Sequence, residues 1–310
     1  MASMTGKGDL FDKCVTVEIP KLGEGHVRVS ICVPRVTEEQ DTASKPLILV
    51  AEGGGFVLGQ PSDGETNDRM LSDAVNAVVV SVDYAKSPRY PYPHALLQLF
   101  EVLLWATGGQ LAEVLGFDID PSRVAVMGNS AGGNLTAALT MLVSFTSGPC
   151  ATYRKRLPES FKIAAQVLLY PSLACNRPYL ERYSSSDDAV RAASLPVSVA
   201  SLMEDAYLPP YIDQNQVFIA PVDADVDMVR SLGLPSTLCL TAGKDCLKHE
   251  AEAYTNNLKD AGVDVRVHEY PNAIHGFSHY KKGYEEERED CWNRIRVFLG
   301  ECLSRNGPQA

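Results

Sequence analysis

The chain has 310 residues, of which 45% are hydrophobic and 22% charged, a composition typical of soluble globular proteins. Its formal net charge of −11, without a lysine and arginine cluster, excludes a nucleic-acid-binding surface, because phosphate contacts require basic side chains. No apolar run is long enough for a membrane helix, and the first residues lack the apolar core of a secretory signal, so we expect a cytoplasmic protein without a membrane span.

Strands and helices alternate along the chain. Alternating apolar residues at 27–33 predict a half-buried strand, and residues 14–19 predict its antiparallel neighbour. Continuous apolar runs, typical of parallel strands buried on both faces, follow at 47–51, 78–82, 124–127, 163–169 and 237–241, with an alternating strand at 263–267. Helical patterns lie at 95–105, 135–143, 250–258 and 285–303. The order predicts one α/β domain over 1–310, a mostly parallel central sheet flanked by helices.

Residues 172–222 interrupt this alternation with a polar stretch and one helical pattern at 196–207. An insertion of this size after a strand usually covers the carboxyl edge of the sheet, so we expect a small helical cap. Alternatively, the insertion is a surface excursion with no part in binding. Phe56, Met203 and Tyr207 are the residues that we expect in a substrate pocket.

The strand at 124–127 ends at Gly128-Asn129-Ser130-Ala131-Gly132, directly before a helix. Gly-x-Ser-x-Gly between a strand and a helix is typical of a nucleophile elbow, in which the serine hydroxyl is exposed at the sheet edge. By chance alone the same pattern marks a glycine-rich turn without chemistry. The surrounding strand and helix favour a catalytic Ser130.

A serine nucleophile needs a base and a group that orients the base. Asp245 follows the strand at 237–241, and His275 precedes the last helix, so the chain order is Ser, Asp, His. Asp83 is the competing acid, but it precedes Ser130. His279 is expected to be a surface residue, and the remaining histidines to be solvated or core residues.

Glu52-Gly53-Gly54-Gly55-Phe56 follows the strand at 47–51. Glycines let a bare backbone approach a ligand, so this loop is the predicted oxyanion hole. Its N–H donors would come from Gly54, Gly55 and Ala131.

These motifs, together with Asp83-Tyr84, Ser87-Pro88, Tyr92-Pro93 and His275-Gly276-Phe277, resemble the hormone-sensitive-lipase family of α/β-hydrolases, from about residue 46 to the C-terminus. The resemblance implies hydrolysis of carboxylic esters through an acyl serine, with no cofactor. At the positions of Glu52, Asn129 and Ala85, the family usually has histidine, aspartate and arginine, respectively. We expect the Glu52 carboxylate to point away from the oxyanion hole, since a negative charge there would oppose the reaction.

The leading functional prediction is therefore a serine esterase acting on short or medium acyl esters, or on one dedicated metabolite ester. An acyltransferase or a lactone or amide hydrolase would use the same three residues, and a non-catalytic small-molecule receptor is the alternative of another class. The eight scattered cysteines have no metal-ligand spacing, so they are interpreted as free thiols, and no metal is expected. The only predicted ligand is a small-molecule ester, and the oligomeric state, homodimer included, is left open.

Overall fold

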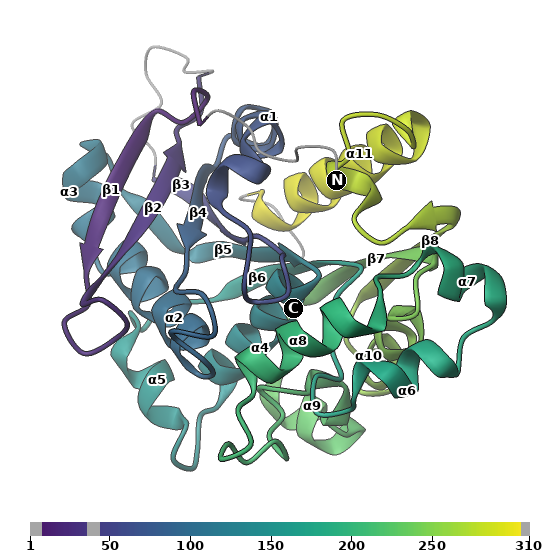
Figure 1. The fold of residues 1–310 in the computed structure, drawn as a ribbon. Helices are drawn as coiled ribbons and strands as arrows, with labels where there is room; N and C mark the ends of the chain where they lie inside the picture. The colour runs from purple at the N-terminus through teal and green to yellow at the C-terminus, as the bar shows by residue number, and fades with distance from the viewer. Residues whose placement is uncertain (1–7, 36–43, 305–310) are drawn as a thin grey trace.

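The computed structural model describes residues 8–35 and 44–304. Its centre is an eight-stranded sheet in the order β1-β2-β4-β3-β5-β6-β7-β8 (Figure 1). β2 runs antiparallel to both of its neighbours, and every pairing from β4 to β8 is parallel. The strands are β1 (Lys13–Glu18), β2 (His26–Cys32), β3 (Lys45–Ala51), β4 (Val78–Asp83), β5 (Ile119–Asn129), β6 (Ile163–Leu169), β7 (Ser236–Lys244) and β8 (Val265–Ile274). The predicted α/β architecture is confirmed.

Helices cover both faces of the sheet, which explains the continuous apolar strands. In β3, Leu47 and Leu49 enter the core on one face, whereas Ile48 and Val50 enter the core on the other. Helices α1 (Glu65–Val75) and α11 (Glu285–Leu303) pack on the Ile48 face. Helices α2 (His94–Thr107) and α4 (Ala131–Ser144) pack on the Leu47 face, and α10 (Lys248–Asp260) shares a further cluster of buried side chains with α4.

Several elements differ from the sequence predictions. β8 extends to Ile274, well beyond the predicted end at residue 267, so that His275 directly follows a strand and does not lie in a long loop. Helix α1 was not predicted because the residues that it buries include Asp68, Arg69 and Ser72, which give no apolar pattern. The remaining short elements carry too few turns for a periodicity: α3 (Gln110–Leu115), α5 (Ala151–Arg156), α9 (Val226–Leu232), η1 (Pro61–Asp63), η2 (Pro221–Asp223) and η3 (Phe277–His279).

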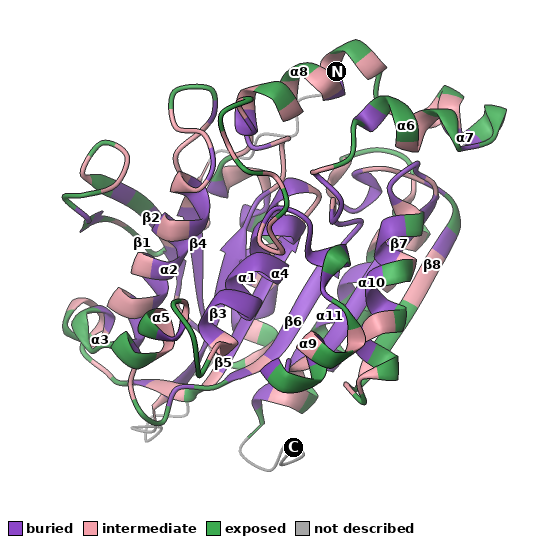
Figure 2. Cartoon of the chain, turned by 90° about the horizontal axis from the view of Figure 1, so that it is seen from below, coloured by how far each residue is buried: buried purple, intermediate pink, exposed green. Residues whose placement is uncertain are grey.

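The insertion at 172–222 contains α6 (Tyr179–Ser184), α7 (Asp188–Ala193) and α8 (Val197–Tyr207). Figure 2 shows these three helices together beyond one end of the sheet, with more exposed surface than the strands beneath. Arg182 on α6 connects two other helices: its guanidinium pairs with Glu204 on α8 and, at 3.3 Å, with Glu250 on α10. The insertion is thus attached to the main body of the fold by an ion pair that is almost fully buried.

Candidate active site

Ser130 occupies the sharp turn between β5 and α4. Its backbone has φ 55° and ψ −120°, a conformation that costs a non-glycine residue roughly 1–3 kcal/mol. Its N–H donates to the carbonyl of Leu169 at 2.9 Å, which ties the turn to β6. The turn also needs glycine at 132, because a Cβ there would lie 1.9 Å from the carbonyl oxygen of Ala51. The structure therefore has the strained strand-to-helix turn that the sequence predicts.

His275 bridges the other two predicted catalytic side chains. Its Nδ1 lies 2.6 Å from Asp245 Oδ2, and its Nε2 lies 2.8 Å from Ser130 Oγ. Asp245 Oδ1 also accepts the N–H of Leu247 at 3.0 Å, which fixes the carboxylate. These distances hold the imidazole in the tautomer that carries its proton on Nδ1 and leaves Nε2 free to accept one.

The pKa of His275 reflects this arrangement. Burial lowers the pKa of the imidazole, but the charge and hydrogen bond of Asp245, together with the charge of Glu250, outweigh it, so the net pKa lies above the usual 6.5. The protonated imidazole is therefore more stable in this site than it is in water. That is the electrostatic requirement for a base that takes a proton from a serine.

The glycine loop lies beside Ser130. Gly53 N–H donates to Asn129 Oδ1 at 2.8 Å, and a Cβ on Gly53 would lie 3.1 Å from Ser130 Cβ. Gly54 and Gly55 have φ of 129° and 61°, so the loop needs glycine there. Within residues 8–35 and 44–304, no acceptor takes the N–H of Gly54, Gly55 or Ala131. The three predicted donors are therefore available to a ligand.

The three predicted pocket residues connect this loop to helix α8. A Cβ on Gly55 would lie 2.3 Å from Met203 Sδ, so the methionine covers the loop directly. Phe56 and Tyr207 stack with ring centroids 3.6 Å apart, and both rings are buried. Met203 is thus in contact with the glycine loop, whereas Phe56 and Tyr207 pack against each other and fix α8 to it.

Glu52 lies at the start of the loop, with its side chain 5% exposed. Its Oε1 packs against Gly64, where a Cβ would lie 2.1 Å away, and its Oε2 lies 3.5 Å from His279 Nε2. In the described part of the chain the carboxylate accepts no hydrogen bond from Gly54 or Gly55. This placement agrees with the expectation that the Glu52 carboxylate avoids the oxyanion hole.

The prediction that His279 is a surface residue is wrong, because its side chain is only 5% exposed. Its Nδ1 lies 2.8 Å from the hydroxyl of Tyr170, the residue after β6, whose ring meets the His275 ring edge-on at 5.0 Å. Sequence reasoning missed His279, Tyr170 and the role of Asn129. The only available signal was that Tyr170 and Asn129 end buried strands, and that His279 lies four residues after His275.

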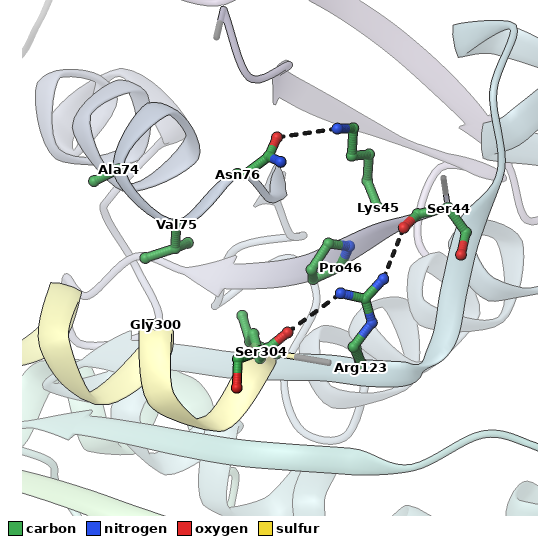
Figure 3. Close-up of a pocket in the computed structure, with 10 residues that line it drawn as sticks. Ser44, Lys45, Pro46, Ala74, Val75, Asn76, Arg123, Gly300 and Ser304 are labelled. Atoms are coloured by element: carbon green, nitrogen blue, oxygen red, sulfur yellow. Dashed lines mark hydrogen bonds between the residues drawn. The ribbon is translucent and has the colours of Figure 1, made fainter. Parts of the chain in front are cut away.

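A cavity of about 480 Å³ lies at the opposite end of the sheet from Ser130. Figure 3 shows the residues that line it. Its lining includes Lys45, the first residue of β3, whereas the glycine loop follows the last residue of that strand. Lys45 Nζ donates to Asn76 Oδ1 at 3.1 Å, and Arg123 donates to the carbonyls of Ser44 and Leu303. Because the cavity lies at the other end of the sheet, it is separate from the candidate active site.

Two further observations concern membrane-spanning helices and metal-binding groups. None of the helices described is both long and apolar enough to cross a membrane. Within the same residues, histidine, cysteine and acidic side chains form no group of three that could hold a metal ion, and all eight cysteines are unpaired.

Known proteins resemble this chain over most of its length. Residues 48–279 match the family model described as alpha/beta hydrolase fold. Carboxylesterase NlhH of Mycobacterium tuberculosis is 30% identical over 243 residues, which cover 76% of this chain and 67% of that protein. Arylacetamide deacetylase of Oryctolagus cuniculus is 24% identical over 318 residues, covering 85% and 76%. The solved structure of EstE1, a thermophilic carboxylesterase cloned from a metagenomic library, matches with a TM-score of 0.76 and 27% identity, covering 95% of this chain and 90% of that one.

Proposed function

Because this chain belongs to the alpha/beta hydrolase fold family, we propose that it hydrolyses carboxylic esters of small molecules through an acyl enzyme on Ser130. The observation that carries the proposal is the continuous run from Asp245 through His275 to Ser130, with contacts of 2.6 and 2.8 Å. A receptor without catalytic activity has no need of this geometry.

In the first half of the reaction, His275 Nε2 takes the hydroxyl proton while Ser130 Oγ forms a bond to the ester carbonyl carbon. The carbonyl oxygen becomes an oxyanion, to which the N–H groups of Gly54, Gly55 and Ala131 donate. His275 then gives its proton to the leaving alcohol, and the ester C–O bond breaks. Water repeats the sequence on the acyl serine and releases the acid.

Substrate enters, in this proposal, between the glycine loop and the insertion at 172–222, which serves as the cap. Met203 is the candidate for the acyl-binding wall because it covers Gly55, while the buried stack of Phe56 and Tyr207 supports that wall. Cytoplasmic location and the single-domain division remain predictions from the sequence, and the oligomeric state remains open.

The test is hydrolysis of p-nitrophenyl esters from acetate to decanoate, with p-nitroacetanilide as the matched amide. We expect the esters to be cleaved much faster than the amide, with a clear chain-length preference. Met203→Ala should shift that preference toward longer chains, because it removes the side chain above Gly55. Faster cleavage of p-nitroacetanilide than of the esters would instead support an amide hydrolase, in line with the name of the relative arylacetamide deacetylase. An unchanged profile for Met203→Ala would remove α8 from the pocket.

The pH dependence follows from the pKa of His275. Only the neutral imidazole accepts the serine proton, and its pKa is raised above 6.5, so activity should fall as pH decreases through a midpoint above 6.5. The pH profile of kcat/KM measures this midpoint in the free enzyme. Asp245→Asn removes the charge that raises the pKa, and should move the acid limb to lower pH in whatever activity remains. A wild-type midpoint well below 6.5 would contradict the assignment of His275 as the base.

A further inference from the structure

Beside the glycine loop lies a row of buried polar side chains that the proposed mechanism does not use. It begins at Glu52, whose carboxyl lies 3.5 Å from His279 Nε2. His279 follows His275 by four residues, in the short helix η3, so this contact joins the loop of the oxyanion donors to the segment of the base. Both side chains are 5% exposed.

The contacts of His279 continue to the end of β6. His279 Nδ1 lies 2.8 Å from the Tyr170 hydroxyl and 2.9 Å from Ser278 Oγ. Tyr170 directly follows Leu169, the last residue of β6, which pairs with Asn129, the residue before the nucleophile. Asn129 Oδ1 accepts the N–H of Gly53, the residue after Glu52, at 2.8 Å.

Burial keeps this row of side chains nearly free of charge. It raises the pKa of the Glu52 carboxyl well above its usual range, and the charges of Asp68 and Asp63 raise it further. Burial also lowers the pKa of His279 to about 4, so the imidazole is neutral at pH 7. The raised pKa of Glu52 reduces the negative charge that its carboxyl places near a developing oxyanion, compared with an ordinary carboxylate.

We propose that Glu52 and His279 are positioning residues, whose contact holds the Gly54 and Gly55 donors in place relative to His275. The inference rests on the proposed function. Because the oxyanion exists only in the transition state and the intermediates, losing this contact should lower kcat and leave KM nearly unchanged. A purely structural role would instead lower stability and leave turnover per folded molecule unchanged.

The experiment compares Glu52→Ala, His279→Gln, their combination and Glu52→Gln. Removing a whole oxyanion donor costs about 100-fold to 1000-fold in kcat, and a displaced donor costs less, so we expect about tenfold to 100-fold for each of the first two variants. Since both side chains act through one contact, the double variant should have a kcat no lower than that of the less active single variant. Glu52→Gln keeps an uncharged hydrogen-bonding group and should retain at least about half of wild-type kcat.

A matched control exists on the surface, where His249 Nδ1 lies 3.1 Å from Glu252 Oε2 with side chains 62% and 45% exposed. His249→Gln and Glu252→Ala should leave kcat unchanged. Thermal unfolding of every variant gives its folded fraction, and kcat is then expressed per folded molecule. A normal kcat in Glu52→Ala and His279→Gln with a lower Tm would overturn the inference, and so would a Glu52→Gln variant as impaired as Glu52→Ala.

Affinity for a trifluoromethyl ketone provides a readout without turnover. Ser130 Oγ adds to its carbonyl carbon, the hydroxyl proton passes to His275, and the ketone oxygen becomes an oxyanion in the hole. The two disrupting variants should bind this ketone about tenfold to 100-fold more weakly, in proportion to their loss of kcat. If the wild type binds the ketone and cleaves esters while the variants match it, only the inference fails. If the wild type does neither, the proposed function fails and the inference fails with it.

Discussion

Replacing Ser130 with alanine is expected to lower kcat for p-nitrophenyl acetate by about 10⁶-fold, with little change in stability. Without Oγ no acyl enzyme forms, and the His275 and Asp245 side chains have no nucleophile to activate. What remains is the smaller effect of binding and of the oxyanion donors on attack by water. The folded state should persist, because Ser130 Oγ bonds only to His275 among the described residues.

The measurement is pre-steady-state hydrolysis of p-nitrophenyl acetate by the wild type and the variant. The wild type should release a burst of p-nitrophenol equal to the enzyme concentration if deacylation is the slower step, and Ser130→Ala should release none. Labelling by a fluorophosphonate should be lost in parallel. Activity within tenfold of the wild type would show that another residue is the nucleophile.

Gly132→Ala is expected to have the largest effect on folding, about 4 kcal/mol or more in the free energy of unfolding. The new Cβ would lie 1.9 Å from the Ala51 carbonyl oxygen and 3.0 Å from the Glu52 carbonyl carbon. Either the end of β3 or the start of α4 must move, and the glycine loop moves with the former. Any folded fraction should therefore also lose about 100-fold or more in kcat.

Gly300→Ala in α11 is the matched control, because both residues are helical and the nearest atom to its new Cβ is Val75 Cγ1 at 3.9 Å. Alanine is the better helix former, so this variant should gain about 0.5–1 kcal/mol. Urea unfolding of the two variants and the wild type distinguishes the effect of the close backbone approach at Gly132 from the effect of helix propensity alone. Equal unfolding midpoints for Gly132→Ala and the wild type would contradict the geometry described for the turn.

Much of the fold follows from the sequence because both faces of the sheet are covered. In β3 residues 47–51 are continuously apolar, and in β6 Gln166 is the one polar residue, a pattern typical of parallel strands buried on both faces. The resemblance to the hormone-sensitive-lipase family, which predicted the fold, agrees with the family match and with the related carboxylesterases. The ends of β8 were not predictable, because an edge strand has one neighbour only and its residues are mostly part-exposed.

The candidate site was predictable only where chemistry leaves a local motif. Ser130, Asp245 and His275 each follow a strand or turn of recognisable type, so their convergence followed from the topology. His279 and Tyr170 carry no such motif. Their importance arises from tertiary contacts between the end of β6 and η3, which lie 109 positions apart in the chain.

The strained backbone at the nucleophile has a consequence for how this protein can change. Five non-glycine residues among those described have positive φ, and three of them, Phe56, Ser130 and Tyr170, belong to the candidate site. Each such conformation costs roughly 1–3 kcal/mol, which the rest of the fold must offset. Stabilising substitutions chosen at these positions would relax the geometry on which turnover depends, so selection for thermal resistance should act elsewhere, on the outer helices and loops.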